Sequence, residues 1–334
     1  GANNKVFQFA SLGAAPQALL VEVIRFRRGF DFDRRWLAAL QGGITTAYLS
    51  PGRQRLVSGQ GAVVKLAGRN LVERVLNENA CLRINFGDGA IRAPRLFEPV
   101  PHPTSDEPLE ASRIQTPTAR ISVLAELRAM FGAATDAVKA PGGVGPAENR
   151  YDERPLAAVV EGKLPLRAAA SRSQDVRRAL ELQKELGVRM VLEDPQDIGP
   201  VAGQAAAQKV AATFRMPVRP GQQNPGGEDR QVKTQELRFD APAKAAAAGM
   251  LVGVAPAAGA SPRDWLMAAA LAVRGGLSPQ QALRAIGADA AAILGVDSRV
   301  GTLAPGKDAD FVVLNGEPLA VGTMVEQTWV DGRK

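Results

Sequence analysis

The hydrophobic pattern of the chain consists of short apolar runs that end at Gly, Pro or Asp, each followed by a stretch with helical spacing. Short runs rich in β-branched residues between turn signals are typical of strands. We therefore expect strands at residues 5–12, 45–50, 81–86, 165–170, 188–193, 216–219 and 250–255. A further run, residues 62–66, is ambiguous. Because strands that alternate with helices build βαβ units, the pattern predicts an α/β fold around a parallel sheet.

Start and stop signals locate helices between these strands. Residues 175–186 carry an apolar stripe and are followed by Gly187, which is a common residue just after a helix. Ser261 and Ser278 are each followed by Pro, the usual order of an N-cap and a first helical position. Residues 119–131 carry a second apolar stripe. These signals predict helices after several of the expected strands.

Four segments depart from the alternation. Residues 93–118 and 220–229 are rich in Pro or Gly and polar residues, and we expect long loops there. Residues 310–315 and 324–330 are strand-like, with no helix between them. The end of the chain is therefore predicted to differ in architecture from the rest.

Composition and charge narrow the classes of protein that the chain can represent. It has 334 residues, of which 46% are hydrophobic and 22% charged, close to globular averages. No uninterrupted apolar stretch approaches the roughly 18 residues that a membrane span requires. The formal net charge is +7, but Lys and Arg are scattered among Asp and Glu. We interpret this charge as a solvated basic surface and expect no nucleic-acid partner.

The chain has one histidine, His102, and one cysteine, Cys81. One cysteine cannot form a disulfide within the chain. Structural zinc is typically held by Cys and His ligands together and catalytic zinc mostly by several His, so neither site can be built from this pair. We expect His102 to be an exposed loop residue. Cys81 begins an apolar run with no basic neighbour to lower its pKa, and we expect a buried structural thiol.

Residues 278–319 carry a long motif, SPQQALRAIGADAAAILGVDSRVGTLAPGKDADFVVLNGEPL. This motif resembles the C-terminal segment of the amidohydrolase superfamily, and most of all its imidazolonepropionase-like members. The residues that match the family pattern are Gly301, Leu303, Pro305, Gly306, Lys307, Ala309, Asp310, Val312, Val313, Gly316 and Pro318. Further stretches that resemble the family in the same order are residues 42–52, 58–68, 117–128 and 164–194.

The resemblance implies a distorted TIM (β/α)8 barrel of the metal-dependent hydrolase type over residues 1–300. The functional site of such a barrel lies at the carboxyl ends of its strands. Residues 301–334 would be the C-terminal strands of a composite β-sandwich that is incomplete in this chain. We expect these strands to carry unpaired edges and exposed apolar side chains such as Phe311, Val313 and Trp329, and the natural protein to have an N-terminal extension.

The family hydrolyses non-peptide C–N bonds of small molecules with Zn or another divalent metal. The positions that match its metal ligands hold Phe9, Ser11, Ala169, Ser171, Asp194 and Ala257. None of these is histidine, and Ala and Phe cannot bind a metal. We therefore expect no bound metal and a catalytically degenerate barrel, which binds a small molecule or acts as a partner or structural half. The alternative is an active hydrolase with carboxylate ligands or with ligands outside this chain.

No catalytic residue can be assigned from the sequence, but five polar residues are candidates for the pocket. They are Asp194, Glu193, Ser171, Asn85 and Asp88. Asp, Asn and Ser near Pro or Gly are also common in turns, and this simpler interpretation stays open for them. The run SGQG at residues 58–61 lacks the spacing of a nucleotide-binding loop, and we expect a tight turn between strands there.

The remaining properties follow only in part. The Ala-, Arg- and Gly-rich composition is consistent with a bacterium of high genomic GC. The sequence is compatible with a homo-oligomer. The sequence leaves open the substrate or ligand and the compartment, cytoplasmic or exported.

Overall fold

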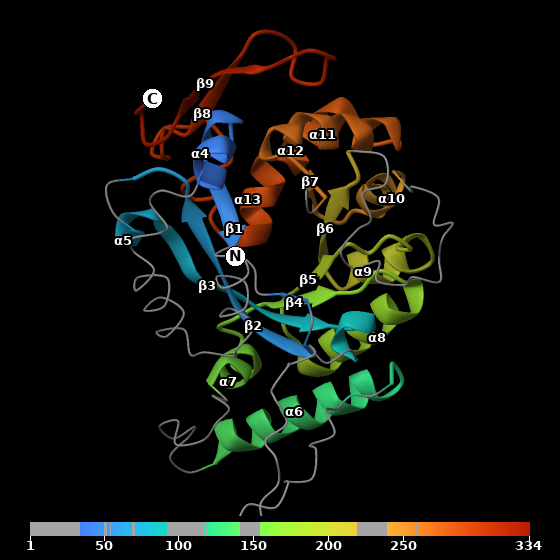
Figure 1. Cartoon of the computed structure of the whole chain (residues 1–334). Helices are drawn as coiled ribbons and strands as arrows, with labels where there is room; N and C mark the ends of the chain where they lie inside the picture. The colour runs from blue at the N-terminus through green and yellow to red at the C-terminus, as the bar shows by residue number, and fades with distance from the viewer. Residues whose placement is uncertain are drawn as a thin grey trace, which may run out of the picture.

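The computed structural model describes residues 34–49, 52–53, 55–68, 71–91, 117, 119–140, 154–218, 239–257 and 260–334. Seven strands form one curled sheet in the order in which they occur along the chain (Figure 1). They are β1 (Thr46–Leu49), β2 (Val57–Lys65), β3 (Val75–Asn85), β4 (Leu166–Ala169), β5 (Met190–Glu193), β6 (Ala211–Met216) and β7 (Val252–Pro256).

Strand directions bring six carboxyl ends to one edge of the sheet. β3 to β7 are parallel, whereas β2 is antiparallel to both β1 and β3. β1 therefore runs in the same direction as β3 to β7. A curled, mostly parallel sheet with helices outside it fits a distorted TIM barrel, and the expected α/β class is confirmed.

Helices follow most of the parallel strands and pack on the outer face of the sheet (Figure 1). The helices are α4 (Arg34–Gln41), α5 (Leu71–Arg74), α6 (Ser122–Lys139), α7 (Arg154–Val160), α8 (Ser173–Leu186), α9 (Ala202–Ala207), α10 (Ala241–Ala247), α11 (Trp265–Arg274), α12 (Pro279–Ala285) and α13 (Ala288–Leu294). The expected helix starts are confirmed, because Ser261 and Ser278 both form capping boxes. Gly187 ends α8 in the left-handed region, with φ of 65°.

Alternate side chains of the strands point to opposite faces of the sheet. On β4, Leu166 and Ala168 belong to the main hydrophobic core beneath the helices, whereas Arg167 and Ala169 point to the inner face. The same alternation on β3, β5 and β6 sends the large apolar side chains outward into this core. On these four strands the inner face thereby carries mainly polar and small residues, although the strands are buried on both sides.

The C-terminal segment forms a separate two-stranded antiparallel sheet of β8 (Phe311–Leu314) and β9 (Val325–Trp329). The rings of Phe311 and Trp329 stack with centroids 5.5 Å apart, and Val313 is 36% exposed. Lys65 at the end of β2 connects this sheet to the barrel. Its ammonium group, on a residue only 1% exposed, is paired with three carboxylates. They belong to Asp308 (2.7 Å), Asp310 (2.9 Å) and Asp331.

Two sequence predictions about strands need correction, and one ambiguous run is resolved. Only Met216 of the expected strand at 216–219 belongs to β6, which begins at Ala211, because Ala and Arg hide the strand in the sequence pattern. The SGQG run is not a turn between strands, since it lies inside β2. There Gly59, with φ of 119°, stands at an irregularity in the pairing with β3. The ambiguous run at 62–66 is also part of β2, up to Lys65.

Some predicted segments fall outside the described residues. These are the expected strand at 5–12, the loop at 93–118 apart from Pro117, and the loop at 220–229. Within the described part of the chain, no helix is long and apolar enough to cross a membrane.

Candidate functional site

Glu193 is the centre of a buried ion-pair network at the carboxyl end of β5. Its carboxylate contacts Arg83 on β3, Arg167 on β4 and, at 3.2 Å, Arg53 from the segment between β1 and β2. Sheet register explains the convergence, because Ala169 lies opposite Glu193 and Arg83 lies opposite Arg167 on neighbouring parallel strands. The small side chain of Ala169 leaves room on the inner face for the long side chains around it.

Asp194 extends this network by one residue. Its two carboxylate oxygens accept hydrogen bonds from the backbone N–H (2.7 Å) and Nε (2.6 Å) of Arg215 on β6. Arg53 lies 2.9 Å from the same carboxylate. Asp194 has φ of 53°, in the left-handed region that Asp tolerates better than most residues. Asp194 is therefore both a strand-end turn residue, as one interpretation of the sequence predicts, and a buried charged group.

We call these six residues the arginine cluster: Arg53, Arg83, Arg167, Arg215, Glu193 and Asp194. It carries four guanidinium groups and two carboxylates. Burial raises the pKa of Glu193, but its guanidinium partners outweigh burial and hold that pKa well below its usual range. Burial likewise raises the pKa of Asp194, and Arg215 and Arg53 together lower it further than burial raises it. Both acids are therefore ionised at neutral pH.

Tyr48 on β1 lies beside the arginine cluster. The guanidinium carbon of Arg167 is 4.3 Å from the centre of the Tyr48 ring, and the Tyr48 hydroxyl is 2.8 Å from the Cys81 sulfur. Gly61 on β2 makes room for this ring, because a Cβ there would approach the ring to 2.5 Å. Burial raises the pKa of the Cys81 thiol. The expected buried thiol is confirmed, and its raised pKa makes it a weak nucleophile.

Two of the candidate residues lie at the same carboxyl edge as Glu193 and Asp194. Asn85 ends β3, and its Nδ2 donates to the Ser58 hydroxyl at 2.7 Å and to the carbonyl of Arg55. Ser171 follows β4, and its hydroxyl donates to the carbonyl oxygen of Asp194 at 2.9 Å. Asn85 thus fixes the segment that leads to Arg53, and Ser171 fixes the turn at Asp194.

Asp88 lies in a different ion-pair group. It belongs to a short 3-10 turn after β3, and its carboxylate accepts from Arg120 Nε at 2.6 Å. Arg120 also contacts Asp175 at the start of α8, at 2.6 Å. Asp88 therefore connects the end of β3 to the outer helices. His102, Phe9 and Ser11 lie outside the described residues.

The described residues at the predicted metal-ligand positions do not fit a divalent cation. Ala169 and Ala257 have no side-chain donor, and the Ser171 hydroxyl is engaged with a backbone carbonyl. The carboxylate of Asp194 faces two guanidinium groups, whose positive charge would repel a metal ion placed between them. In the described ranges, no group of three or more His, Cys, Asp or Glu could hold a metal ion.

Sequence reasoning missed all four arginines of the cluster. A signal was present, because Arg83, Arg167 and Arg215 each stand inside an apolar strand run, as in LRIN, LRAA and TFRM. Arg is almost never fully buried unless it is paired. An arginine in a buried strand therefore predicts a carboxylate partner on a neighbouring strand. Arg53 gave no such signal, because it comes from an irregular segment.

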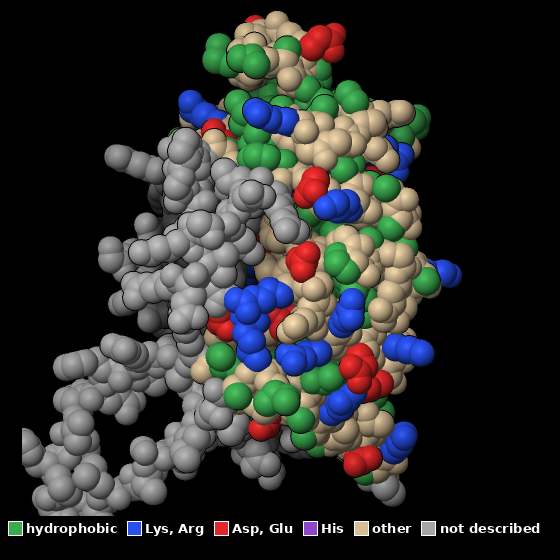
Figure 2. Space-filling model, turned by 90° about the vertical axis from the view of Figure 1, so that its right-hand side faces the viewer, with side chains coloured by type: hydrophobic (Ala, Val, Ile, Leu, Met, Phe, Trp, Pro, Cys, Tyr) green, Lys and Arg blue, Asp and Glu red, His purple; other side chains and the backbone are tan. Residues whose placement is uncertain are grey.

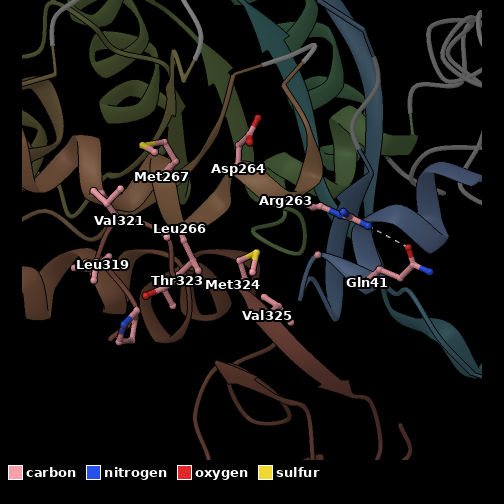
Figure 3. A pocket seen from close by; sticks show the side chains of 15 residues that line it. Gln41, Arg263, Asp264, Leu266, Met267, Leu319, Val321, Thr323, Met324 and Val325 are labelled. Carbon is pink, nitrogen blue, oxygen red and sulfur yellow. Dashed lines mark hydrogen bonds between the residues drawn. The ribbon is translucent and has the colours of Figure 1, made fainter. Parts of the chain in front are cut away.

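A separate cavity of about 370 Å³ lies between the start of α11 and the segment before β9 (Figure 3). Met267, Val321 and Met324 line one part of it, and Arg263 donates to Gln41 at 3.3 Å on another. Asp264 also lines the cavity, but its carboxylate caps the preceding turn, where it accepts a hydrogen bond from the Ser261 N–H. The cavity shares no residue with the arginine cluster.

One protein family and several solved structures are similar to this chain. The model of the amidohydrolase family matches residues 168–334. No curated protein matches the chain. The structure of an amidohydrolase from Thermotoga maritima MSB8 is similar, with a TM-score of 0.74 and 25% identity. The match covers 91% of this chain and 74% of the Thermotoga maritima chain.

Two prolidase structures match a smaller part of this chain. One is a prolidase complexed with N-methylphosphonate-L-proline, with 20% identity and a TM-score of 0.43 over 57% of this chain and 50% of its own. The other is a putative prolidase from Bifidobacterium longum, with 25% identity and a TM-score of 0.37 over 57% of this chain and 54% of its own. The matches span about half the length of these prolidases.

Proposed function

The chain belongs to the amidohydrolase family, as the motif at residues 278–319 predicts, and we propose that it is a catalytically degenerate member that binds a small molecule. Family membership indicates the fold, whereas the function has to be argued from the side chains of the site. In this fold the site lies at the carboxyl ends of the barrel strands. The proposal therefore depends on the side chains found at that edge.

The proposal rests on one observation: the carboxylate of Asp194 is paired with arginine side chains. The sequence resemblance puts Asp194 at a metal-ligand position after a barrel strand. Its carboxylate is buried and engaged by the Arg215 side chain and backbone and by Arg53. A divalent cation bound there would have to displace at least one guanidinium and leave it buried near a second positive charge. Burying an unpaired charge is strongly unfavourable.

The neighbouring positions support the same proposal. A catalytic metal needs several protein ligands to hold it and to lower the pKa of its bound water. Ala169 and Ala257 supply no ligand, and the other carboxylate at this edge, Glu193, is surrounded by three guanidinium groups. Without an activated water, hydrolysis of a C–N bond has no nucleophile among these residues, since the buried Cys81 thiol has a raised pKa.

A combined activity and binding experiment tests the proposal. The full chain is incubated with cyclic amides, ureas and amino-heterocycles, with and without added Zn²⁺ or Mn²⁺, and thermal-shift assays measure binding of the same compounds. We expect no turnover above that of heat-inactivated protein under any metal condition, together with stabilisation by a subset of compounds.

Metal-dependent turnover that the Asp194→Ala variant loses would contradict the proposal. It would favour the alternative of an active hydrolase whose ligands include carboxylates or residues outside the described ranges. Turnover that survives Asp194→Ala and follows a metal bound elsewhere would contradict it equally.

A further inference from the structure

The arginine cluster has two layers that differ in exposure. Arg83 and Arg167 have side chains 7% and 8% exposed, and both are bound to Glu193. Arg53 and Arg215 have side chains 15% and 23% exposed, and both contact the same oxygen of Asp194, at 2.9 and 2.6 Å. The outer layer therefore places two guanidinium groups side by side around one carboxylate, nearer to solvent than the inner layer.

The outer layer carries more positive than negative charge. Asp194 is a single carboxylate shared by two arginines, while Glu193 is already shared by three. Burial lowers the pKa of Arg215, Asp194 raises it, and the neighbouring Arg53 lowers it again, with a net decrease. The Arg53 Nε atom is buried and has no hydrogen-bond partner among the described residues. Buried donors of this kind normally have partners.

We propose that Arg53 and Arg215 bind the oxyanion of a small molecule, a carboxylate or a phosphate, beside Asp194 at the carboxyl edge of the barrel. This inference rests on the proposed function, because it names the chemical class of the ligand that the degenerate barrel binds. Guanidinium groups present several N–H donors in a plane and match oxyanions in two-point hydrogen bonds. A bound oxyanion would supply the negative charge that the outer layer lacks.

The surroundings favour a small anion over a nucleic acid. Only two arginines of the cluster reach solvent in part, and both contact Asp194 at the carboxyl edge of the barrel, where small-molecule ligands bind in this fold. A polyanion requires a row of exposed Lys and Arg. On the face shown in Figure 2, Lys and Arg side chains are interspersed with Asp and Glu and do not form such a row.

Calorimetric titration of the full chain with inorganic phosphate and, separately, with malonate tests the inference. Ionic strength is held constant with NaCl so that general screening does not change. We expect one site per chain. Arg215→Gln should weaken binding by about tenfold or more, because it removes a charge-assisted hydrogen bond. Asp194→Asn should strengthen binding, because it removes the carboxylate that competes with the ligand for the same arginines.

Arg128→Gln is the matched control. Arg128 is an arginine with two carboxylate partners, like those of the cluster, but it lies on α6 and is 43% exposed. Its loss should leave anion affinity unchanged. If Arg215→Gln does not fold, Arg215→Lys keeps the charge and loses the planar fork, and should weaken binding severalfold. Phosphate and malonate together show whether the site prefers phosphate or carboxylate, and preference for either supports the inference.

Two results would overturn the inference. One is the absence of binding of both anions at millimolar concentration. The other is equal affinity in the wild-type, Arg215 and Asp194 variants. Either result leaves the proposed function standing if the protein still lacks metal-dependent turnover and binds uncharged compounds. Conversely, metal-dependent turnover would contradict the proposed function whatever the anion titration shows.

Discussion

Two buried ionic groups in this molecule have opposite compositions. The arginine cluster surrounds two carboxylates with four guanidinium groups at the carboxyl edge of the barrel. The Lys65 group surrounds one ammonium with the three carboxylates of Asp308, Asp310 and Asp331. Both lie on the same sheet, since Lys65 ends β2 and the arginines come mainly from β3, β4 and β6.

The difference separates a candidate ligand site from a structural connection. In the Lys65 group, the barrel supplies the cation and the C-terminal segment supplies all three carboxylates, so the contact joins two sheets. In the arginine cluster, all members come from one sheet and its connecting segments, and the surplus charge is positive. The cluster therefore connects neighbouring strands of one sheet, and the anion proposed above would balance its positive surplus.

The largest effect is expected from Glu193→Gln. This change keeps the side-chain volume and leaves Arg83 and Arg167 buried without their carboxylate. Removing one partner of a buried ion pair typically destabilises a protein by about 3–5 kcal/mol. Urea unfolding should therefore show a loss of this order in the free energy of unfolding. A loss below about 1 kcal/mol, in the range of exposed pairs, would contradict a buried, tightly paired Glu193.

The pH dependence of that loss gives a second check. The pKa of Glu193 is lowered on folding from an ordinary value of 4.5, so its ionised form stabilises the folded state. This contribution is fully present above pH 4.5 and is lost as the pH falls through the folded pKa. The difference between wild type and Glu193→Gln should be constant from pH 7 to pH 5 and shrink below pH 4.5. A difference that grows on acidification would have the wrong sign.

A smaller and more local effect is expected from Lys65→Met. The three carboxylates would lose their shared cation and repel one another, but Asp308 and Asp331 are 19% and 47% exposed and water screens them in part. We expect a loss of about 2 kcal/mol, concentrated where the C-terminal sheet meets the barrel. Hydrogen exchange should accelerate in β8 and β9 and stay unchanged in β4 and β5. Uniform acceleration across both sheets would show that Lys65 supports the barrel itself.

Gly61→Ala should perturb one edge of the arginine cluster. The added methyl group would overlap the Tyr48 ring and push it from Cys81 and Arg167. Overpacking of this kind typically destabilises by about 1–3 kcal/mol. Because Cys81 is the one cysteine of the chain, the rate of its modification by a thiol reagent reports the change directly. The rate should rise in Gly61→Ala, and an unchanged rate would mean that Tyr48 does not cover the thiol.

The smallest effect is expected from Arg128→Gln. Arg128 on α6 pairs with Glu181 and with Glu185 on α8 (2.5 Å), but all three side chains are well exposed to water. Exposed ion pairs contribute little to stability. The melting temperature should not change measurably. A clear decrease would mean that the exposed surface contributes to stability as strongly as the two buried ionic groups.

The α/β class and most elements could be predicted because strand and helix signals are local, whereas the barrel was implied by the family resemblance. Capping at Ser261 and Ser278 and the stop at Gly187 depend on neighbouring residues alone, and each lies where expected. β6 was misplaced because its sequence, AATFRM, has weak strand preference and is held by pairing with β5 and β7. Such pairing is a property of the folded sheet and leaves little trace in the sequence.

The candidate site was only partly predictable for the same reason. Glu193 and Asp194 follow a recognisable strand, and Ser171 and Asn85 lie at the same edge, as the barrel predicts. Their arginine partners come from other strands, up to 140 residues away in the chain in the case of Arg53 and Glu193. Asp88 has a similar sequence context to Asn85 but pairs with Arg120, which also contacts Asp175 on α8. Side-chain direction after a strand end is set by the packed structure.

Elemental analysis of the purified full chain tests the central claim most directly. The protein is produced in medium supplemented with zinc and manganese, separated from loosely bound ions, and compared with the Asp194→Ala variant. The account predicts far less than one equivalent of any transition metal per chain in both proteins. About one equivalent of zinc in the wild type, lost in Asp194→Ala, would contradict it.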